Sequence, residues 1–200
     1  MKRFSSPCVS AGLALGASAP AQAAVETYDI DPVHSWVGFT VSHFFTKVPG
    51  FFSMVSGVFV VDRDRLENST AEAVIEAASI TTSAGLRSDH LRSDRFFDVA
   101  RFPTVSFKSK AWKSAGGGAY AVTGDLTIKG VKKEVVLKVT PKGFGTGMNG
   151  AAISGWEISA ALDRRDYGVS ADQGPIGNTV DVLIFIEAVL RKPAQMTVKK

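Results

Sequence analysis

The chain has 200 residues, of which 45% are hydrophobic and 21% are charged. This composition is typical of a globular protein and excludes an intrinsically disordered chain. The formal net charge of +4 is too small to indicate a nucleic-acid-binding protein, so no nucleic-acid partner is expected. A single cysteine excludes an internal disulfide and a cysteine metal cluster, and three histidines leave little room for a histidine site, so no metal is expected.

Residues 1–23 have the three-part pattern of a secretory signal peptide. Met1-Lys2-Arg3 is a basic start, residues 9–21 are apolar or small, and Ala21-Gln22-Ala23 places small residues at the two positions that a signal peptidase reads. A transmembrane helix is disfavoured, because the run contains Gly, Ser and Pro and falls well short of about 20 apolar residues. We therefore expect cleavage after Ala23, a periplasmic location and one domain over residues 24–192, followed by a polar tail at 193–200.

The mature chain shows the period-2 alternation of apolar and polar residues that is typical of β-strands. The segments that alternate, or that read as apolar strands, are 34–43, 52–62, 71–80, 105–111, 120–128, 135–139, 153–162 and 179–190. Short strands separated by turn residues favour an antiparallel sandwich or barrel. The absence of a strand–helix–strand rhythm argues against a doubly wound nucleotide-binding fold.

The alternation also assigns faces. Phe107 and Leu126 are predicted to point inward on adjacent strands, and Lys108 is predicted to point outward. Val105, Ser109 and Ala111 share the face of Phe107 in this reading. Tyr120 and Val122 share the face of Leu126.

Residues 83–100 break the strand pattern. Leu86, Leu91 and Phe97 loosely share one helical face, and Pro103 ends the segment before the next strand. We predict a short helix or two here, so that three strands precede the helical insert and five follow it.

The insert carries the densest polar cluster of the chain, residues 87–98, with three Arg and three Asp. One interpretation is a solvated helix surface with weak local ion pairs. The other is a group of cations at the mouth of an apolar cavity, where they would hold a polar or anionic head group. In that second reading the head-group residues are Arg87, His90 and Arg164.

Motifs of catalysis are scarce. The glycine run 116–118 does not lead into Gly-Lys-Ser/Thr, so it is not a phosphate loop. Ser88 or Ser93 could pair with His90, but no Gly-x-Ser-x-Gly elbow occurs, which argues against a hydrolase. No catalytic residue and no enzyme activity are therefore expected.

The phenylalanines are more often ordinary core residues than ligand contacts. An eight-stranded barrel, however, is wide enough to hold one small ligand. The residues predicted to line such an apolar cavity are Phe39, Phe59, Phe97, Phe107, Tyr120, Val122 and Leu126.

Several motifs, in order along nearly the whole mature chain, resemble those of the YceI family. They are Asp31-Pro32-Val33-His34, Ser56-Gly57-Val58-Phe59, Arg87-Ser88-Asp89-His90-Leu91, Phe102-Pro103-Thr104-Val105-Ser106-Phe107, Gly124-Asp125-Leu126-Thr127-Ile128-Lys129-Gly130 and Arg164-Arg165-Asp166-Tyr167-Gly168. The chain departs from the family pattern at Tyr167, where Phe is usual, and over residues 48–56, which are bulkier.

This resemblance implies an all-β fold, an extended eight-stranded antiparallel lipocalin-like barrel with a short helical insert between the third and fourth strands. It implies a long hydrophobic pocket for an isoprenoid or another amphiphilic chain, and no known catalytic activity. The expected partner is a lipid-like small molecule. No cofactor is expected beyond such a bound lipid, for example one like ubiquinone or a polyprenyl.

The leading hypothesis is a periplasmic binding or carrier protein without catalysis. The alternative is an enzyme that acts on an isoprenoid-type lipid and uses His90 or His34 as acid or base. An outer-membrane barrel is disfavoured, because Lys108, Lys110, Glu134 and Lys138 would face lipid, so no stable membrane insertion is expected. The sequence leaves the oligomeric state open, with a homodimer as one option.

Overall fold

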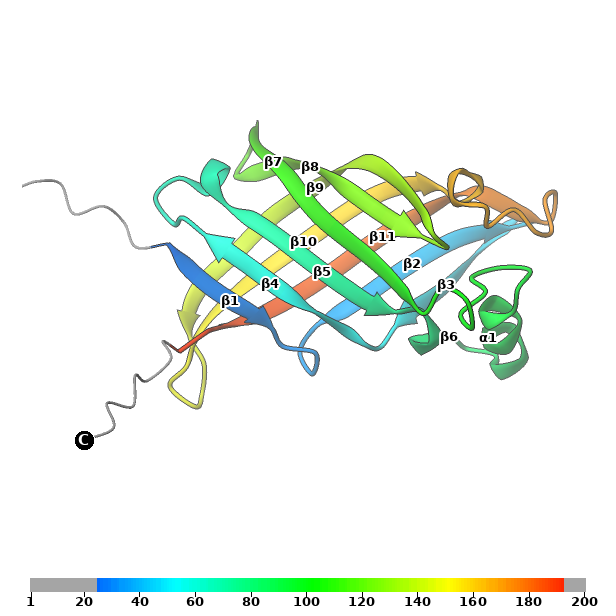
Figure 1. The fold of residues 1–200 in the computed structure, drawn as a ribbon, viewed down its shortest axis with the longest axis horizontal. Coiled ribbons are helices and arrows are strands. Elements are labelled where there is room, and N and C mark those ends of the chain that lie inside the picture. Colours follow the sequence, from blue (N-terminus) through cyan, green and yellow to red (C-terminus); the bar gives the residue numbers. More distant parts are fainter. Residues whose placement is uncertain (1–24, 193–200) are drawn as a thin grey trace, which may run out of the picture.

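The structure of the protein, a computed structural model, describes residues 25–192 and consists mostly of β-strands (Figure 1). The signal peptide and the C-terminal tail expected from the sequence lie outside the described residues. The strands are β1 (Glu26–Ile30), β2 (Trp36–His43), β3 (Thr46–Phe52), β4 (Val55–Val61), β5 (Thr70–Glu76), β6 (Ile80–Thr82), β7 (Thr104–Gly116), β8 (Ala119–Ile128), β9 (Val131–Thr146), β10 (Ala152–Asp163) and β11 (Ile176–Leu190). The helices are α1 (Gly85–Arg92) and the short 3₁₀ turns η1 (Leu66–Asn68), η2 (Ala77–Ser79) and η3 (Arg164–Tyr167).

These strands form an antiparallel barrel with eight strand positions, as expected. The sheet order is β1-β4-β5-β7-β8-β9-β10-β11-β2-β3-β6, and a further pairing of β1 with β11 closes it. β1 and β2 pair with successive parts of the same edge of β11 and together form one position. β3 and β4 form the next position and β5 and β6 the third, because β3 pairs with β2 and β6, while β4 pairs with β1 and β5.

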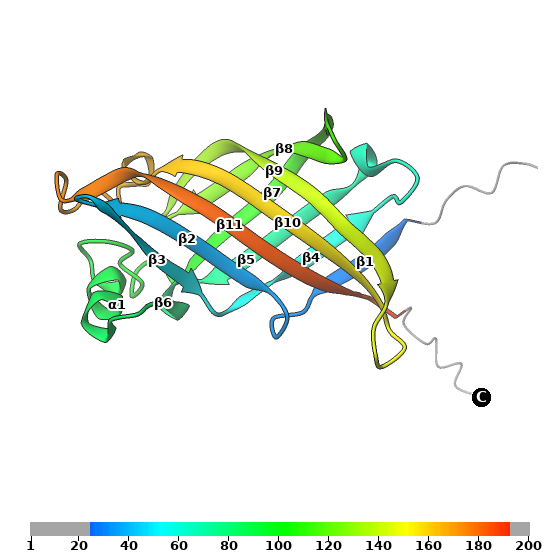
Figure 2. The ribbon, with the colours of Figure 1, turned by 180° about the vertical axis from the view of Figure 1, so that it is seen from behind.

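The insert lies where it was predicted, between the third and fourth strand positions. α1 follows β6 and covers one end of the barrel, together with the segment that leads into β7 (Figures 1 and 2). Among the described residues β6 pairs only with β3, so its other edge has no neighbouring strand. At this end of the barrel α1 and residues 93–103 follow β6 in place of a further strand. We call this end of the barrel the open end.

The opposite end, which we call the closed end, is filled by aromatic side chains. Phe59 stacks on Trp156 with ring centroids 4.9 Å apart, and Trp112 and Phe144 meet Trp156 edge to face at 5.9 and 5.6 Å. Trp156 and Tyr28 are each 1% exposed. Interlocked aromatic rings of this size exclude water and stop the barrel interior from running through the molecule.

The inward faces agree with the alternation at most positions. Phe107 lies opposite Leu126 in the β7–β8 ladder, and both side chains point into the barrel. The prediction for Ala111 is wrong, because the register of β7 against β8 shifts between Ser109 and Ala111. The extra residue is a β-bulge, which turns the next side chain over, so Trp112 and not Ala111 is buried inside.

Candidate ligand-binding cavity

The barrel contains a cavity of about 460 Å³. Its wall is almost entirely apolar and draws on the inward faces of most strands, for example Phe39, Phe107, Val122, Leu126, Ile158 and Ile184. The volume lies within the range of about 300–1,000 Å³ that small-molecule pockets occupy. The interior is therefore not filled throughout by its own side chains, and its free space has the size of a small-molecule pocket.

Two glycines make room for the phenylalanine rings on this wall. A Cβ atom at Gly50 would lie 2.3 Å from the ring of Phe39, its partner across the β2–β3 ladder. A Cβ atom at Gly124 would lie 2.5 Å from the ring of Phe107. Each ring therefore lies flat against the sheet, which leaves the centre of the barrel free.

The cavity ends at the aromatic cluster of the closed end. Phe59 and Trp112 line it there, and Trp112 is 3% exposed. The indole Nε1 of Trp112 is buried and has no hydrogen-bond acceptor among the described residues. The deep part of the cavity thus has apolar rings and one hydrogen-bond donor on a lining residue.

Exposed side chains line the cavity at the open end, which is therefore its mouth. His43, Arg87 and His90 are all exposed lining residues. Arg87 and His90 come from α1, whose first residues follow directly from the short pairing of β6 with β3. The guanidinium of Arg87 and the imidazoles of His43 and His90 are thereby placed beside the apolar interior of the cavity.

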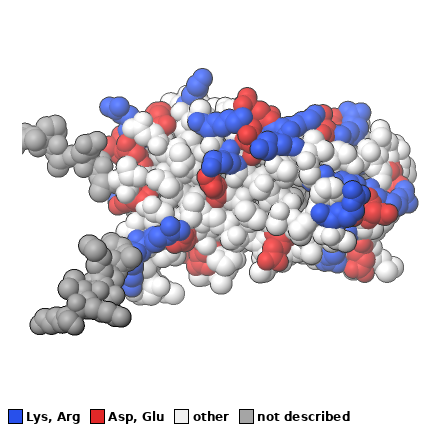
Figure 3. Space-filling model, in the orientation of Figure 1, with Lys and Arg blue, Asp and Glu red and all other residues white. Residues whose placement is uncertain are grey.

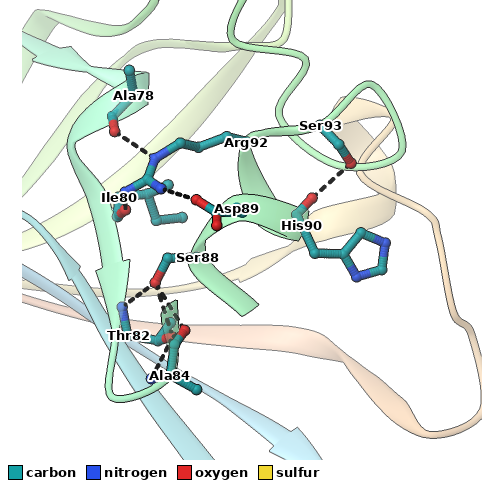
Figure 4. Close-up of polar contacts among 9 residues, drawn as sticks. All are labelled: Ala78, Ile80, Thr82, Ala84, Ser88, Asp89, His90, Arg92 and Ser93. Carbon is teal, nitrogen blue, oxygen red and sulfur yellow. Dashed lines mark hydrogen bonds and ion pairs between the residues drawn. The ribbon is translucent and has the colours of Figure 1, made fainter. Parts of the chain in front are cut away.

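The remaining polar residues of α1 attach the helix to the barrel (Figure 4). The hydroxyl of Ser88 accepts a hydrogen bond from the backbone N–H of Thr82 at 2.9 Å. The guanidinium of Arg92 donates to the carbonyl oxygens of Ala78 at 2.8 Å and Ile80 at 2.6 Å, and it pairs with Asp89 at 2.8 Å. These bonds fix the helix over the mouth without using Arg87 or His90.

The imidazole of His90 lies apart from those hydrogen bonds (Figure 4). Its ring meets that of Phe96 edge to face, with the ring centroids 4.9 Å apart. Ser93 donates its hydroxyl hydrogen to the backbone carbonyl of His90 at 2.7 Å, not to the imidazole. Ser88 is likewise bonded to backbone groups of Thr82 and Ala84. Neither serine is therefore bonded to His90 in the manner of a nucleophile and its base.

Arg164 has a structural environment that the sequence did not reveal. It is 7% exposed, and its guanidinium donates to the carbonyl oxygens of Val169 (2.8 Å), Ala171 (2.7 Å), Ile176 (3.1 Å) and Gly177 (2.9 Å). Burial lowers the pKa of Arg164 from its ordinary value. Four of the five N–H donors of a guanidinium are engaged in this way, so one donor remains for other contacts. Arg164 thus holds the connection between η3 and β11, residues 168–175, which we call the rim loop.

All but one of the predicted site residues line the cavity. Those that do are Phe39, Phe59, Phe97, Phe107, Val122, Leu126, Arg87, His90 and Arg164. Tyr120 lies on the inward face but near the closed end, where its ring packs against Trp112 at 6.1 Å, and it does not line the cavity. Lining residues that the prediction omitted include Trp112, Leu137 and Ile184. Leu137 lies on a strand with a clear alternation, whereas Ile184 lies in a run that is apolar on both faces.

His34 lies outside the cavity, in the connection between β1 and β2. Its Nδ1 is 2.8 Å from a carboxylate oxygen of Asp31 and 3.6 Å from one of Glu187, and the hydrogen bond with Asp31 raises the pKa of His34. These three side chains offer metal-ligand atoms within 4.8 Å of one another. Their mutual ion pairing accounts for the arrangement, and we assign no metal to it.

None of the helices in the described part of the chain has both the length and the apolar character needed to cross a membrane.

Comparison with known proteins supports the relationship that the motifs suggested. Residues 28–188 match the YceI-like domain. A UPF0312 protein of Pseudomonas savastanoi pv. phaseolicola is 34% identical over 193 residues, which cover 96% of this chain and 100% of the relative.

Two solved structures share the fold. BcnA of Burkholderia cenocepacia is 23% identical, with a TM-score of 0.73 over 79% of this chain and 98% of that one. A polyisoprenoid-binding domain from Saccharophagus degradans, implicated in plant cell wall breakdown, is 16% identical, with a TM-score of 0.62 over 84% of this chain and 100% of that one. The extent of the domain match and the identity to the Pseudomonas relative show that the chain belongs to the YceI family.

Proposed function

We propose that the protein is a periplasmic carrier that holds an isoprenoid or another amphiphilic lipid inside the barrel and performs no catalysis on it. The observation that carries this proposal is the division of the cavity into an apolar interior and a charged mouth. Arg87 and Arg164 line the mouth, and the lining carboxylate of Asp172 is paired with Arg95. An amphiphile has the same division, with an apolar chain and one polar end. Membership of a family with a polyisoprenoid-binding structural neighbour supports the same choice of ligand.

The apolar interior supplies the affinity in this proposal. Each methylene group that leaves water for the cavity contributes roughly 0.8 kcal/mol before the cost of ordering the chain is subtracted. Few polar contacts are then needed, which agrees with the small number of polar side chains on the wall. The flat rings of Phe39 and Phe107 leave the space that such a chain requires.

The polar head lies at the mouth in this arrangement. Arg87 is exposed, lines the cavity and makes no ion pair with another described residue, so its full set of donors is free for an anionic head. His90 lies three residues further along the same helix and also lines the cavity. Arg164 contributes a fixed positive charge to the rim, because most of its donors hold the loop.

Periplasmic location rests on the signal-peptide pattern of residues 1–23. Fractionation of cells that express the chain, followed by the intact mass of the periplasmic form, tests it. A periplasmic protein with the mass of a chain that begins at Ala24 supports export. A full-length product in the cytoplasm contradicts it. Native mass spectrometry of the same material would identify a retained lipid by its mass.

A displacement titration with a fluorescent isoprenoid tests the binding function. Replacing Arg87 by Ala should weaken a ligand with an anionic head by roughly 1.5–3 kcal/mol, the range for a hydrogen bond to a charged group, and leave a neutral ligand with the same tail unchanged. Arg101→Ala is the matched control, because Arg101 is an exposed cation that does not line the cavity. Val122→Trp, which fills the interior, should weaken both ligands alike.

Three results would count against the proposal. Equal weakening of both ligands by Arg87→Ala would remove the head-group role of Arg87. Failure of the unmodified protein to bind any isoprenoid at micromolar concentration would overturn the carrier function itself. Saturable conversion of the bound lipid, lost on His90→Gln, would favour the enzyme hypothesis; His34 is a poorer candidate because it lies on the outside of the barrel.

A further inference from the structure

The turn between β2 and β3 carries two exposed phenylalanines. Phe44 is 66% exposed and Phe45 is 105% exposed, and they form the two-residue connection between the paired residues His43 and Thr46. Hairpin connections of this length favour Asn, Asp and Gly, which tolerate a left-handed backbone and expose no apolar side chain to water. Phe44 adopts a left-handed conformation with φ of 48°. Two large aromatic rings thus occupy positions that normally belong to small polar residues, and they stand in water.

These rings are presented from a fixed support. The backbone N–H of Phe44 donates to the carbonyl oxygen of Pro175 at 2.9 Å. Pro175 belongs to the rim loop that Arg164 holds through its hydrogen bonds to Ala171 and Ile176. The ring of Phe44 also meets that of His43 edge to face at 4.8 Å. The turn is therefore tied to the rim on its backbone side.

The turn lies at the mouth of the cavity. His43, its first residue, lines the cavity, and so does Arg87, which follows the 87% exposed Leu86 on α1. Figures 1 and 2 show α1 and the β2–β3 turn at the same end of the barrel from opposite sides. We call Phe44, Phe45 and Leu86 the apolar rim. It borders the opening through which a cavity ligand must pass.

Positive charge accompanies the apolar rim. Lys47, Arg92 and Arg95 are each paired with an aspartate. Arg87 and Lys132 have no ion-pair partner among the described residues, and Lys129 donates only to the carbonyl oxygens of Asp94 and Gly168. The carboxylates of Glu76, at the end of β5, and of Asp94 are opposing charges near this end that have no ion pair among the described residues. Figure 3 shows basic side chains, with acidic ones among them, at the end that carries α1.

Exposed aromatic and aliphatic side chains next to unpaired Lys and Arg are the combination by which proteins attach to the interface of a bilayer. The rings enter the boundary between head groups and acyl chains, and the cations are attracted to anionic lipids. A protein partner would need only a pocket for the rings. A bilayer would in addition place lipids, the class of molecule that the cavity suits, directly against the open mouth. A lipid tail could then pass between the membrane and the cavity without crossing water.

We propose that the apolar rim docks the mouth of the barrel onto the surface of an anionic bilayer. The proposal rests on the proposed carrier function, since it explains how the carrier collects and delivers its lipid. Docking is peripheral and reversible: the rim enters the interface, and the barrel stays outside the hydrocarbon.

Flotation with lipid vesicles tests the docking. The purified protein is mixed with vesicles of phosphatidylcholine and phosphatidylglycerol, or of phosphatidylcholine alone. The double variant Phe44→Ser/Phe45→Ser should bind the anionic vesicles at least about tenfold more weakly than the unmodified protein, because two aromatic side chains no longer leave water. The matched control is Val33→Ser/Met148→Ser, which removes two apolar side chains that are 81% and 109% exposed but lie away from the mouth. It should float like the unmodified protein.

A second measurement locates the contact directly. Phe45→Trp and Met148→Trp each add one indole at an exposed position, and vesicles of brominated lipid quench an indole that enters the acyl region. Emission from the Phe45→Trp variant should fall more than that of the unmodified protein, and emission from Met148→Trp should not. Equal quenching of the two variants, or equal flotation of the rim variant and its control, overturns the docking proposal.

The titration with a fluorescent isoprenoid, done without vesicles, separates this proposal from the carrier function. The rim variant should bind the free ligand as tightly as the unmodified protein, because neither phenylalanine lines the cavity. Retained ligand binding with no flotation of the unmodified protein overturns docking alone. Flotation without ligand binding overturns the carrier function and leaves docking standing.

Discussion

The two ends of the barrel are built on opposite principles. At the closed end, Tyr28, Phe59 and Trp156 are at most 4% exposed, and their rings pack against one another and against Trp112 and Phe144. At the open end aromatic rings of the same kind are left in solvent, and cations border the cavity. The difference teaches that aromatic residues can stabilise the fold at one end of the barrel and be available for contact with other molecules at the other end.

The largest difference between the two ends should appear in stability. Trp156→Ala removes the ring on which Phe59 stacks, and we expect it to lower the free energy of unfolding by about 3–5 kcal/mol, through lost burial and the cavity left behind. Phe45→Ala should change it by less than about 0.5 kcal/mol, because the side chain is fully exposed. Urea denaturation of both variants measures this, and similar losses would mean that the ends do not differ as described.

A smaller effect should distinguish the buried rim arginine from its exposed neighbour. Arg164→Met leaves the carbonyl oxygens of Val169, Ala171, Ile176 and Gly177 without their donor, so we expect a loss of about 1–3 kcal/mol in the free energy of unfolding. Arg165→Met removes only a surface pair with Asp163 and should lose much less stability than Arg164→Met. Limited proteolysis should cut the loop 168–175 first in Arg164→Met. If Arg165→Met is cut as readily, the hydrogen bonds of Arg164 are not what holds this loop.

The smallest effect concerns pH and the pair of His34 with Asp31, which lies in the β1–β2 connection beside Glu187 of β11. The hydrogen bond with Asp31 raises the pKa of His34, so its contribution to stability is present below the ordinary histidine pKa and is lost as the pH rises through the raised value. The bond with His34 lowers the pKa of Asp31, whose contribution is lost as the pH falls through that lowered value. The pair should therefore stabilise most between roughly pH 4 and pH 6.5.

Urea midpoints on both sides of neutrality test this linkage. The unmodified protein should lose a little more stability than His34→Gln when the pH rises from about 5.5 to about 8.5. The effect is small because His34 is solvent-exposed and Asp31 is only partly buried. A pH profile of His34→Gln that parallels that of the unmodified protein over this range would show that the pair contributes nothing to folding.

Much of this fold could be predicted from the sequence, because a barrel wall with one buried face imposes period-2 alternation. Every segment predicted as a strand overlaps an observed one. The strands that were missed have physical reasons for weak signals. β6 has three residues, β1 has five and is rich in charge, and β3 contains Pro49 and Gly50, which normally argue against a strand.

The cavity residues could be predicted in kind but not in position along the barrel axis. Alternation places Tyr120 and Val122 on the same face, yet only Val122 reaches the cavity, because the two lie at different depths. The bulge before Ala111 has no sequence signal strong enough to reveal that Trp112 turns inward. The carbonyl acceptors of Arg164 come from residues five to thirteen positions away, in an irregular loop and at the first two residues of β11, which no period encodes.

The unpaired edge of β6 has a mechanical consequence for the opening. Around the closed end the circumference is fixed by backbone hydrogen bonds, since β1 joins both β4 and β11. Around the mouth one sector is spanned instead by α1, through side chains such as Ser88 and Arg92. We therefore expect substitutions on this one short helix to change the size of the opening while the backbone pairing of the sheet stays in place.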